Sequence, residues 1–295
     1  MKFFWILTCA VLQISTVAAV WGDSYEAEPG QFPYYVYVEA NLDCGGSLIA
    51  PDVVLTAAHC LGSNYKERVD AGEFQVLVGA MKRTETSGAL WLTVTDVKIP
   101  GKTTTMTLDN ISHSDYNADI ALLKLEKAVV TFSPIELVLN MNDAIPEIGD
   151  DLTMCGLGRG NFPNNNLLSV GYPEFLHYAT SPFKYTRSVC NSGGKASDGV
   201  QMWEDWLTPR QMCWSRCWTK NEVCHGTGDD GGPVVKIDGN IHTLVGVVST
   251  GSSRGKKPDI LASVSRLCEF FQDALCTEWQ TFGPSSYLCS STCIK

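Results

Sequence analysis

The sequence has few charged residues for its length and no block of basic ones. Only 18% of its 295 residues are charged, and the formal net charge is -10. A chain without clustered Lys and Arg lacks the electrostatic attraction that draws proteins to nucleic acid or to anionic lipid. The 44% hydrophobic content allows a sizeable core, so a disordered chain is excluded as well.

Long apolar runs, internal repeats and cofactor motifs are also missing. After the first residues, no stretch reaches the roughly 20 apolar residues of a transmembrane helix. No motif for a nucleotide, a haem or a dedicated metal site is present, so we expect no cofactor and no metal. Nucleic acid and membranes are therefore not expected as partners, and the sequence leaves the oligomeric state open.

The N-terminal segment has the pattern of a secretory signal peptide. Lys2 gives a positive start, Phe3 to Leu12 form a short apolar run, and Val17-Ala18-Ala19 has the small residues of a cleavage site. We predict a signal peptide over 1–19, cleavage after Ala19 and a secreted, extracellular protein. The alternative interpretation is a buried hydrophobic strand or helix at the N-terminus.

Cysteine usage agrees with export, because disulfides persist in oxidising compartments. The chain has twelve cysteines, and Cys9 would leave with the signal peptide, so eleven would remain. An odd number requires either one free thiol or a bridge between two chains. Three cysteines lie in the last twenty residues, and we expect 276–295 to be a cysteine-rich tail outside the main core.

The pattern along the chain favours an all-β fold with one helix near its end. Short runs rich in Val, Ile, Tyr and Thr, such as 34–39 and 90–97, alternate with Gly, Asp, Asn and Pro. Many short strands of this kind are typical of a barrel or a sandwich. A helical period is convincing only near the C-terminus, where a terminal helix is predicted. Its apolar face consists of Val264, Leu267, Phe271 and Leu275.

Three segments, in chain order, contain the residue types of acyl transfer. The segment CGGSLIAPDVVLTAAHC, Cys44 to Cys60, sets His59 beside a cysteine that is spaced to close a small loop. Asp119 opens the apolar strand DIALLKL, where a lone carboxylate is costly to bury unless a group such as an imidazole pairs with it. The segment GTGDDGGP, 226–233, has the glycines of a tight turn whose backbone N–H groups can hold a developing oxyanion.

Together, these segments resemble the trypsin and chymotrypsin family of serine proteases (peptidase S1). The resemblance covers 20–275 and implies two six-stranded antiparallel β-barrels, divided near 130–150, with the active site in the cleft between them. It also implies that His59 is the general base and that Asp119 orients it. Gly228 and the residue two places on, Asp230, would supply the oxyanion N–H groups.

The resemblance assigns further positions. The α-amino group of Val20 would fold inward to pair with Asp229, and Ser249 and Gly251 would lie along the substrate backbone. Because Ala19 precedes this start instead of a basic residue, export itself would release the amine. The disulfides that the family implies are Cys44–Cys60 and Cys190–Cys213.

The family pattern breaks at the nucleophile. The family motif is Gly-Asp-Ser-Gly-Gly-Pro, and Asp230 stands in place of the serine. A carboxylate is a poor nucleophile for an amide. Asp119 and Asp230 on two sides of His59 should raise the pKa of its ring, and a protonated ring cannot accept a proton. We expect the Asp230 carboxylate to reach toward His59 or the oxyanion N–H groups and to fill the site itself.

The side-chain specificity pocket cannot be read from the sequence, because GTGDD carries extra residues relative to the preceding cysteine. Counting back from Asp230 places Cys224 at the base of the pocket. Aligning the cysteine instead shifts the base to Val223 or Glu222. The preference for a particular side chain is therefore left open.

Three functions fit this pattern. The first is a secreted pseudoprotease with little or no peptidase activity, which binds or regulates through a protein or peptide ligand in the cleft. The second is an active serine-type endopeptidase in which Asp230 is tolerated, and the third is a structural extracellular protein. Rescue by Thr227 or Ser249 is disfavoured, because neither hydroxyl occupies the nucleophile's turn. A metal site of His59, Asp119 and Asp230 is disfavoured because the family places Asp119 behind the ring.

Overall fold

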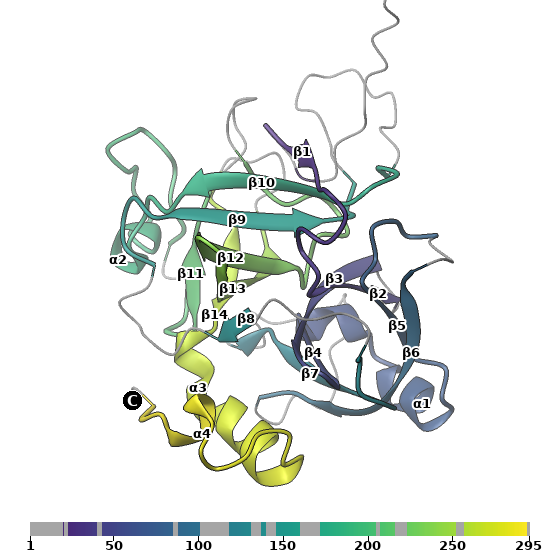
Figure 1. The fold of residues 1–295 in the computed structure, drawn as a ribbon. Helices are drawn as coiled ribbons and strands as arrows, with labels where there is room; N and C mark the ends of the chain where they lie inside the picture. Colours follow the sequence, from purple (N-terminus) through teal and green to yellow (C-terminus); the bar gives the residue numbers. More distant parts are fainter. Residues whose placement is uncertain are drawn as a thin grey trace, which may run out of the picture.

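The computed structural model describes most of the chain after the predicted signal peptide (Figure 1). The predicted signal peptide, 1–19, lies outside the described residues, so its prediction stays open. Within the described part, no helix is both long and apolar enough to cross a membrane. The described residues are 20, 23–39, 43–84, 88–100, 118–130, 137–139, 146–159, 172–204, 207–215, 223–251 and 257–293.

The N-terminal half forms a closed antiparallel barrel, in the strand order β2-β3-β4-β7-β6-β5 (Figure 1). Its interior contains fully buried aliphatic side chains such as Val36, Leu55 and Leu123, as expected for a small barrel that side chains fill. The six strands are β2 (Tyr35–Glu39), β3 (Asp43–Ala50), β4 (Val53–Thr56), β5 (Gln75–Val78), β6 (Leu90–Lys98) and β7 (Ala121–Leu125).

The C-terminal half forms an eight-stranded sheet in the order β1-β10-β9-β12-β13-β14-β11, with β8 added beside β13. The β8–β13 pair is parallel and the other pairs are antiparallel. The strands are β1 (Tyr25–Glu26), β8 (Leu137–Leu139), β9 (Asp151–Gly156), β10 (His177–Pro182), β11 (Gln211–Cys213), β12 (Pro233–Asp238), β13 (Ile241–Thr250) and β14 (Ile260–Ser263).

The predicted all-β fold is therefore present, but the strand pairings of the described residues close one barrel, not two. In the second half the sheet path runs from β1 to β11 without returning on itself. The N-terminal strand β1 adds to the outer edge of β10 and lengthens the sheet. Closure of the second barrel stays a prediction.

The predicted terminal helix is present as three consecutive helical segments. They are η4 (Ser265–Leu267), α3 (Cys268–Phe271) and η5 (Gln272–Glu278), followed in the tail by α4 (Tyr287–Ser290). The four residues of the predicted apolar face are all buried, so the helical period identified the packed side correctly. The remaining helical segments are η1 (Ala58–Leu61), α1 (Tyr65–Asp70) and α2 (Arg187–Cys190).

Two disulfides fasten the tail to this helix. Cys268 is bonded to Cys293, and Cys276 is bonded to Cys289. Between the two bridges, the amide of Gln272 donates hydrogen bonds to backbone carbonyls of the tail, at 2.9 Å and 2.8 Å. The bonded helix residues are eight positions apart and share one face with Gln272. The tail is therefore tied along the helix at several points.

Cys155, in β9, is a free and buried thiol. Burial, and then the nearby charge of Asp229, raise the pKa of this thiol well above its ordinary value, so it is held in the unreactive protonated form. Of the two explanations for an odd number of cysteines, a free thiol inside the protein is the one that the structure contains.

Candidate functional site

The first barrel brings His59 and Asp119 together through the pairing of two strands. His59 lies on η1, directly after β4, and Asp119 lies directly before β7. Because β4 and β7 pair antiparallel, with Thr56 opposite Ala121, the end of one strand meets the start of the other. This pairing explains how residues 60 positions apart in the sequence become neighbours.

Asp119 is fully buried and accepts three hydrogen bonds. The backbone N–H of His59 donates at 3.0 Å, its ring Nδ1 donates at 2.8 Å, and the hydroxyl of Ser249 donates at 2.5 Å. Burial favours the neutral acid, but the charge of His59 and these hydrogen bonds outweigh it and hold the pKa of Asp119 below its ordinary value. Asp119 is therefore a fixed anion behind the ring.

The electrostatic environment of His59 favours a protonated ring. Burial lowers the pKa of His59, whereas the charge and hydrogen bond of Asp119 and then the charge of Asp230 raise it, to a net value of about 9. The direction agrees with the prediction from two flanking carboxylates. At neutral pH, such a ring holds its proton and is a poor general base.

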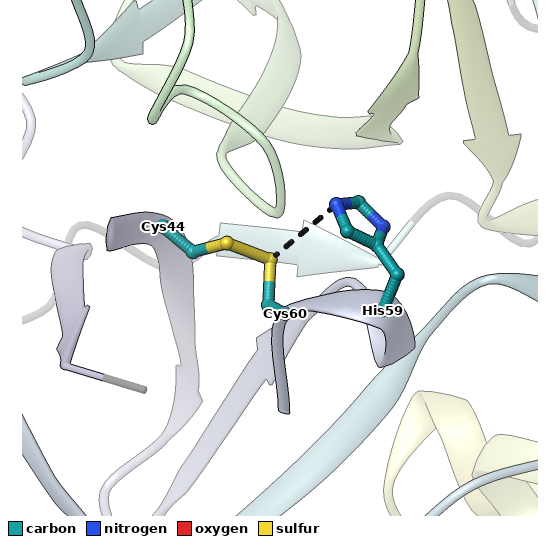
Figure 2. Close-up of side chains that lie close together, drawn as sticks. All are labelled: Cys44, His59 and Cys60. Carbon is teal, nitrogen blue, oxygen red and sulfur yellow. Dashed lines mark hydrogen bonds between the residues drawn. A yellow bond between two sulfur atoms is a disulfide. The ribbon is translucent and has the colours of Figure 1, made fainter. Parts of the chain in front are cut away.

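The disulfide Cys44–Cys60 fixes η1 against the first barrel. Figure 2 shows His59 beside this bridge. The ring Nε2 lies 3.9 Å from the sulfur of Cys60. Cys44, His59 and Cys60 have ligand-type atoms within 4.8 Å of one another, which is the spacing of a metal site. Both sulfurs are committed to the bridge, so neither is a thiolate that could bind a metal. The cluster supports His59 structurally.

The turn 226–233 is held between the two halves of the molecule. Its residue Asp230 accepts a hydrogen bond at its backbone carbonyl from the N–H of Gly45 in β3, at 2.7 Å. Gly231 has φ +78°, and a Cβ there would lie 2.2 Å from the hydroxyl of Thr56. A side chain at this position would collide with β4, so glycine allows the turn to approach the first barrel closely.

Asp229 is fully buried at the base of this turn. It accepts the backbone N–H groups of Gly158 and Gly226, each at 2.7 Å. Burial raises its pKa to about 7 despite these bonds, so a nearby cation would stabilise its charged form. Val20 is also fully buried, in the core cluster of the second half that contains Val223. Pairing of the Val20 amine with Asp229 stays a prediction.

Asp230 takes a partner that the sequence analysis did not name. Its Oδ1 lies 3.6 Å from Nε2 of His225, and this is the ion pair that the structure gives it within the described residues. The expected ion pair with His59 is corrected accordingly, since Asp230 influences that ring through its charge. Nδ1 of His225 is bound to Asp259, which leaves Nε2 as the nitrogen that faces Asp230.

His225 and Asp259 repeat the arrangement of His59 and Asp119. Both the backbone N–H of His225, at 2.8 Å, and its ring Nδ1, at 2.7 Å, donate to Asp259. Burial lowers the pKa of His225, but the charge and hydrogen bond of Asp259, followed by the charges of Asp230 and Asp229, raise it to about 10. The two histidine rings therefore both favour the charged form near Asp230.

Sequence reasoning missed this second pair, although one signal was near it. Counting back from Asp230 had placed the base of the specificity pocket at Cys224, the residue next to His225. Cys224 itself is disulfide-bonded. The partner Asp259 follows Pro258 directly before β14, and no motif connects it with the turn.

The other predicted positions are near the same centre or support the second half. Ser249 is buried at the end of β13 and bonds Asp119, and Gly251 follows that strand. Gly228 has φ +99°, which suits the sharp turn expected for an oxyanion N–H donor. The predicted bridge Cys190–Cys213 is present and ties α2 to β11.

Comparison with known proteins agrees with this geometry. The sequence model of the trypsin family matches residues 21–270. Human transmembrane protease serine 5 is 28% identical over 263 residues, which are 83% of this chain and 49% of that protein, so the chain spans about half of its length. Mouse chymotrypsin-C is 26% identical over 272 residues, which are 85% of this chain and 87% of that protein.

Proposed function

Because the chain belongs to the trypsin family, we propose that it is a secreted, catalytically impaired member that binds a protein or peptide ligand in the family's cleft. The observation that carries the proposal is Asp230, which stands on the nucleophile's turn where the family has serine. The proposal includes a mature chain that begins at Val20, a protease-like domain over 20–275 with two barrels, and the tail 276–295.

Loss of turnover follows from the chemistry of the three acids around the turn. Attack by the Asp230 carboxylate on an amide would place further negative charge close to Asp119 and Asp229. Proton transfer is impeded too, since the pKa of His59 is raised to about 9. Nucleophile and base are thus both unsuited to peptide hydrolysis at neutral pH.

The parts that position a ligand are retained. The network of Asp119, His59 and Ser249 is intact, and the turn is held against β3 by the bond from Gly45 to Asp230. A binding protein needs this rigid framework and its surface loops, whereas turnover needs in addition a reactive hydroxyl and a neutral base. The disulfides seen within the described residues, together with the bonded state of Cys224, are consistent with an oxidising, extracellular environment.

The proposal is tested by measuring peptide hydrolysis and covalent labelling of the mature wild-type protein. Hydrolysis is measured with a broad peptide library, and labelling is measured with a fluorophosphonate probe for reactive serines. We expect the wild type to hydrolyse no faster than Asp230→Ala, which removes the carboxylate without adding a hydroxyl. Turnover at about 1 s⁻¹ or faster, within the ordinary range of enzymes, would contradict the proposal.

Ligand binding is tested separately with a proteinaceous inhibitor of trypsin-family enzymes that inserts an extended loop into the cleft. We expect the wild type to bind it reversibly, and a competing copy of the loop peptide to displace it. Binding that the loop peptide does not compete with would place the contact elsewhere on the surface.

A further inference from the structure

A hollow with a volume of about 710 Å³ lies where β9 begins and β10 ends, beside α2 (Figure 1). Its size is within the range of about 300–1,000 Å³ that is usual for ligand sites in proteins. At the far end of β9, the N–H of Gly158 is bonded to Asp229 on the nucleophile's turn. The six residues of β9, about 17 Å of extended chain, therefore separate the hollow from that turn.

The wall of the hollow has exposed aliphatic side chains and buried aromatic ones. Ile148, directly before β9, is 55% exposed, and Val189, in α2, is 39% exposed. Phe183 and Tyr185, which follow β10, line the same hollow and are buried. Exposed aliphatic groups that gather in one concave region, rather than singly, are typical of an interaction site. A partner that covered them would remove apolar surface from water.

The hollow is held in shape by the backbone around it. The N–H of Gly149 donates to the carbonyl of Phe183 at 2.9 Å, and the N–H of Phe183 donates to the carbonyl of Asp150 at 2.7 Å. On the opposite side, the disulfide Cys190–Cys213 fastens α2 to β11. A site whose walls are fixed before binding loses little conformational entropy when a ligand arrives.

The charged side chains on the wall favour an anionic ligand. Lys184 and Lys195 line the hollow and are exposed, and neither forms an ion pair with another described residue. Asp198 lines it too, but its carboxylate already accepts hydrogen bonds from the hydroxyl of Tyr185, at 2.7 Å, and the N–H of Val200, at 3.2 Å. Because the whole chain has a formal net charge of -10, two lysines without a counter-charge reverse the charge locally.

We propose that this hollow is a docking site for an extended segment of a partner protein, in which an apolar side chain has acidic neighbours. The apolar side chain packs on Ile148 and Val189, and the acidic side chains pair with Lys184 and Lys195. A polypeptide fits better than a small molecule, because a ligand enclosed in the hollow would leave the exposed aliphatic groups in water, whereas a chain lying across them buries both. The site is separate from the cleft, so the inference goes beyond the proposed function.

The experiment measures the binding of a fluorescein-labelled peptide, Glu-Glu-Leu-Glu-Glu, to the mature protein by fluorescence anisotropy. We expect saturable binding with a Kd below about 1 mM. Lys184→Glu/Lys195→Glu should weaken it at least tenfold, and Ile148→Ser should weaken it about threefold to tenfold. The matched control is Lys66→Glu/Lys127→Glu, which makes the same change in net charge at two exposed lysines outside the hollow and should leave the affinity within about twofold of the wild type.

Binding that does not saturate, equal binding of the peptide Lys-Lys-Leu-Lys-Lys, or undiminished binding by folded Lys184→Glu/Lys195→Glu would overturn the proposal. If that variant does not fold, Lys184→Gln/Lys195→Gln is held to the same comparison. Displacement of the peptide by the inhibitor that occupies the cleft would also overturn it, because the two should bind together. Self-association of the wild type that the lysine variant abolishes would assign the hollow to a second copy of this chain instead. Turnover of peptides by the wild type contradicts the proposed function alone.

Discussion

The two histidine–aspartate pairs have the same local design and different surroundings. In both, one aspartate accepts the backbone N–H and the ring Nδ1 of its histidine. Asp119 has in addition the hydroxyl of Ser249, and the outer nitrogen of His59 faces a disulfide sulfur. The outer nitrogen of His225 faces a third carboxylate. The additional contacts of the first pair are thus with neutral groups, a hydroxyl and a disulfide sulfur, whereas the additional contact of the second pair is with a carboxylate.

This difference shows which of the two histidines Asp230 contacts. Asp230 is in ion-pair distance of His225 and raises the pKa of both rings. Asp230 therefore contacts His225 of the second pair directly, and it influences His59 of the first pair through its charge. If the surroundings decide how each pair behaves, then substitutions at the two pairs should change activity, stability and histidine pKa values to different extents.

Asp230→Ser should have the largest effect, on activity. It places a hydroxyl at the position that the proposal assigns to the nucleophile, and it removes one of the charges that raise the pKa of His59. We expect hydrolysis of library peptides to rise by about 100-fold or more over Asp230→Ala, because a positioned base typically contributes about 10²–10⁴-fold. Equal rates for the Ser and Ala variants would show that the first pair is not competent for catalysis.

Removal of the orienting acids should have the next largest effect, on stability. Asp119→Ala breaks a buried pair and should lower the free energy of unfolding by about 3–5 kcal/mol. Asp259→Ala should cost less, roughly 1.5–3 kcal/mol, because His225 keeps Asp230 as a counter-charge. Urea denaturation followed by tryptophan fluorescence measures both. The control Asp238→Ala, at an exposed strand end, should change stability by less than about 0.5 kcal/mol. Equal costs for the two pairs would contradict the comparison.

The sequence predicted the first pair because each member lies in a recognisable segment. Asp119 opens an apolar strand, where a carboxylate needs a partner, and His59 follows a strand that can pair with it. The second pair has no such signal. His225 and Asp259 are 34 residues apart and meet only because the turn and the start of β14 converge in three dimensions.

In the fold, too, local features could be predicted and long-range contacts could not. The helical period found the buried face of the C-terminal helix, because burial and periodicity are local properties. The pairings of Cys268 and Cys276 with the tail could not be derived, since the two bridges that the resemblance implies leave seven of the eleven cysteines without an assigned partner. The parallel addition of β8 to β13 was also beyond prediction, because it depends on a long-range register.

The pH dependence of stability should follow both rings. Their folded pKa values, about 9 for His59 and about 10 for His225, are above the ordinary value of about 6.5. A raised pKa means that the folded state prefers the charged ring, so this stabilisation is complete below about pH 6.5 and is lost as the pH rises through 9 to 10. Melting temperature should therefore fall across this range. In His225→Ala the fall should be smaller and should end nearer pH 9, and an unchanged profile would contradict the assignment to that ring.

The smallest effect, and the sharpest comparison, is expected from Asp230→Asn. The change removes the charge and keeps the size, so the pKa of both rings should decrease because Asp230 raises both. The decrease should be larger for His225, whose nitrogen lies 3.6 Å from the carboxylate, than for His59. Nuclear magnetic resonance titration of the histidine rings measures the two values in one sample. Equal decreases would mean that Asp230 acts on both rings through charge alone, so the contact with His225 would not distinguish the pairs in solution.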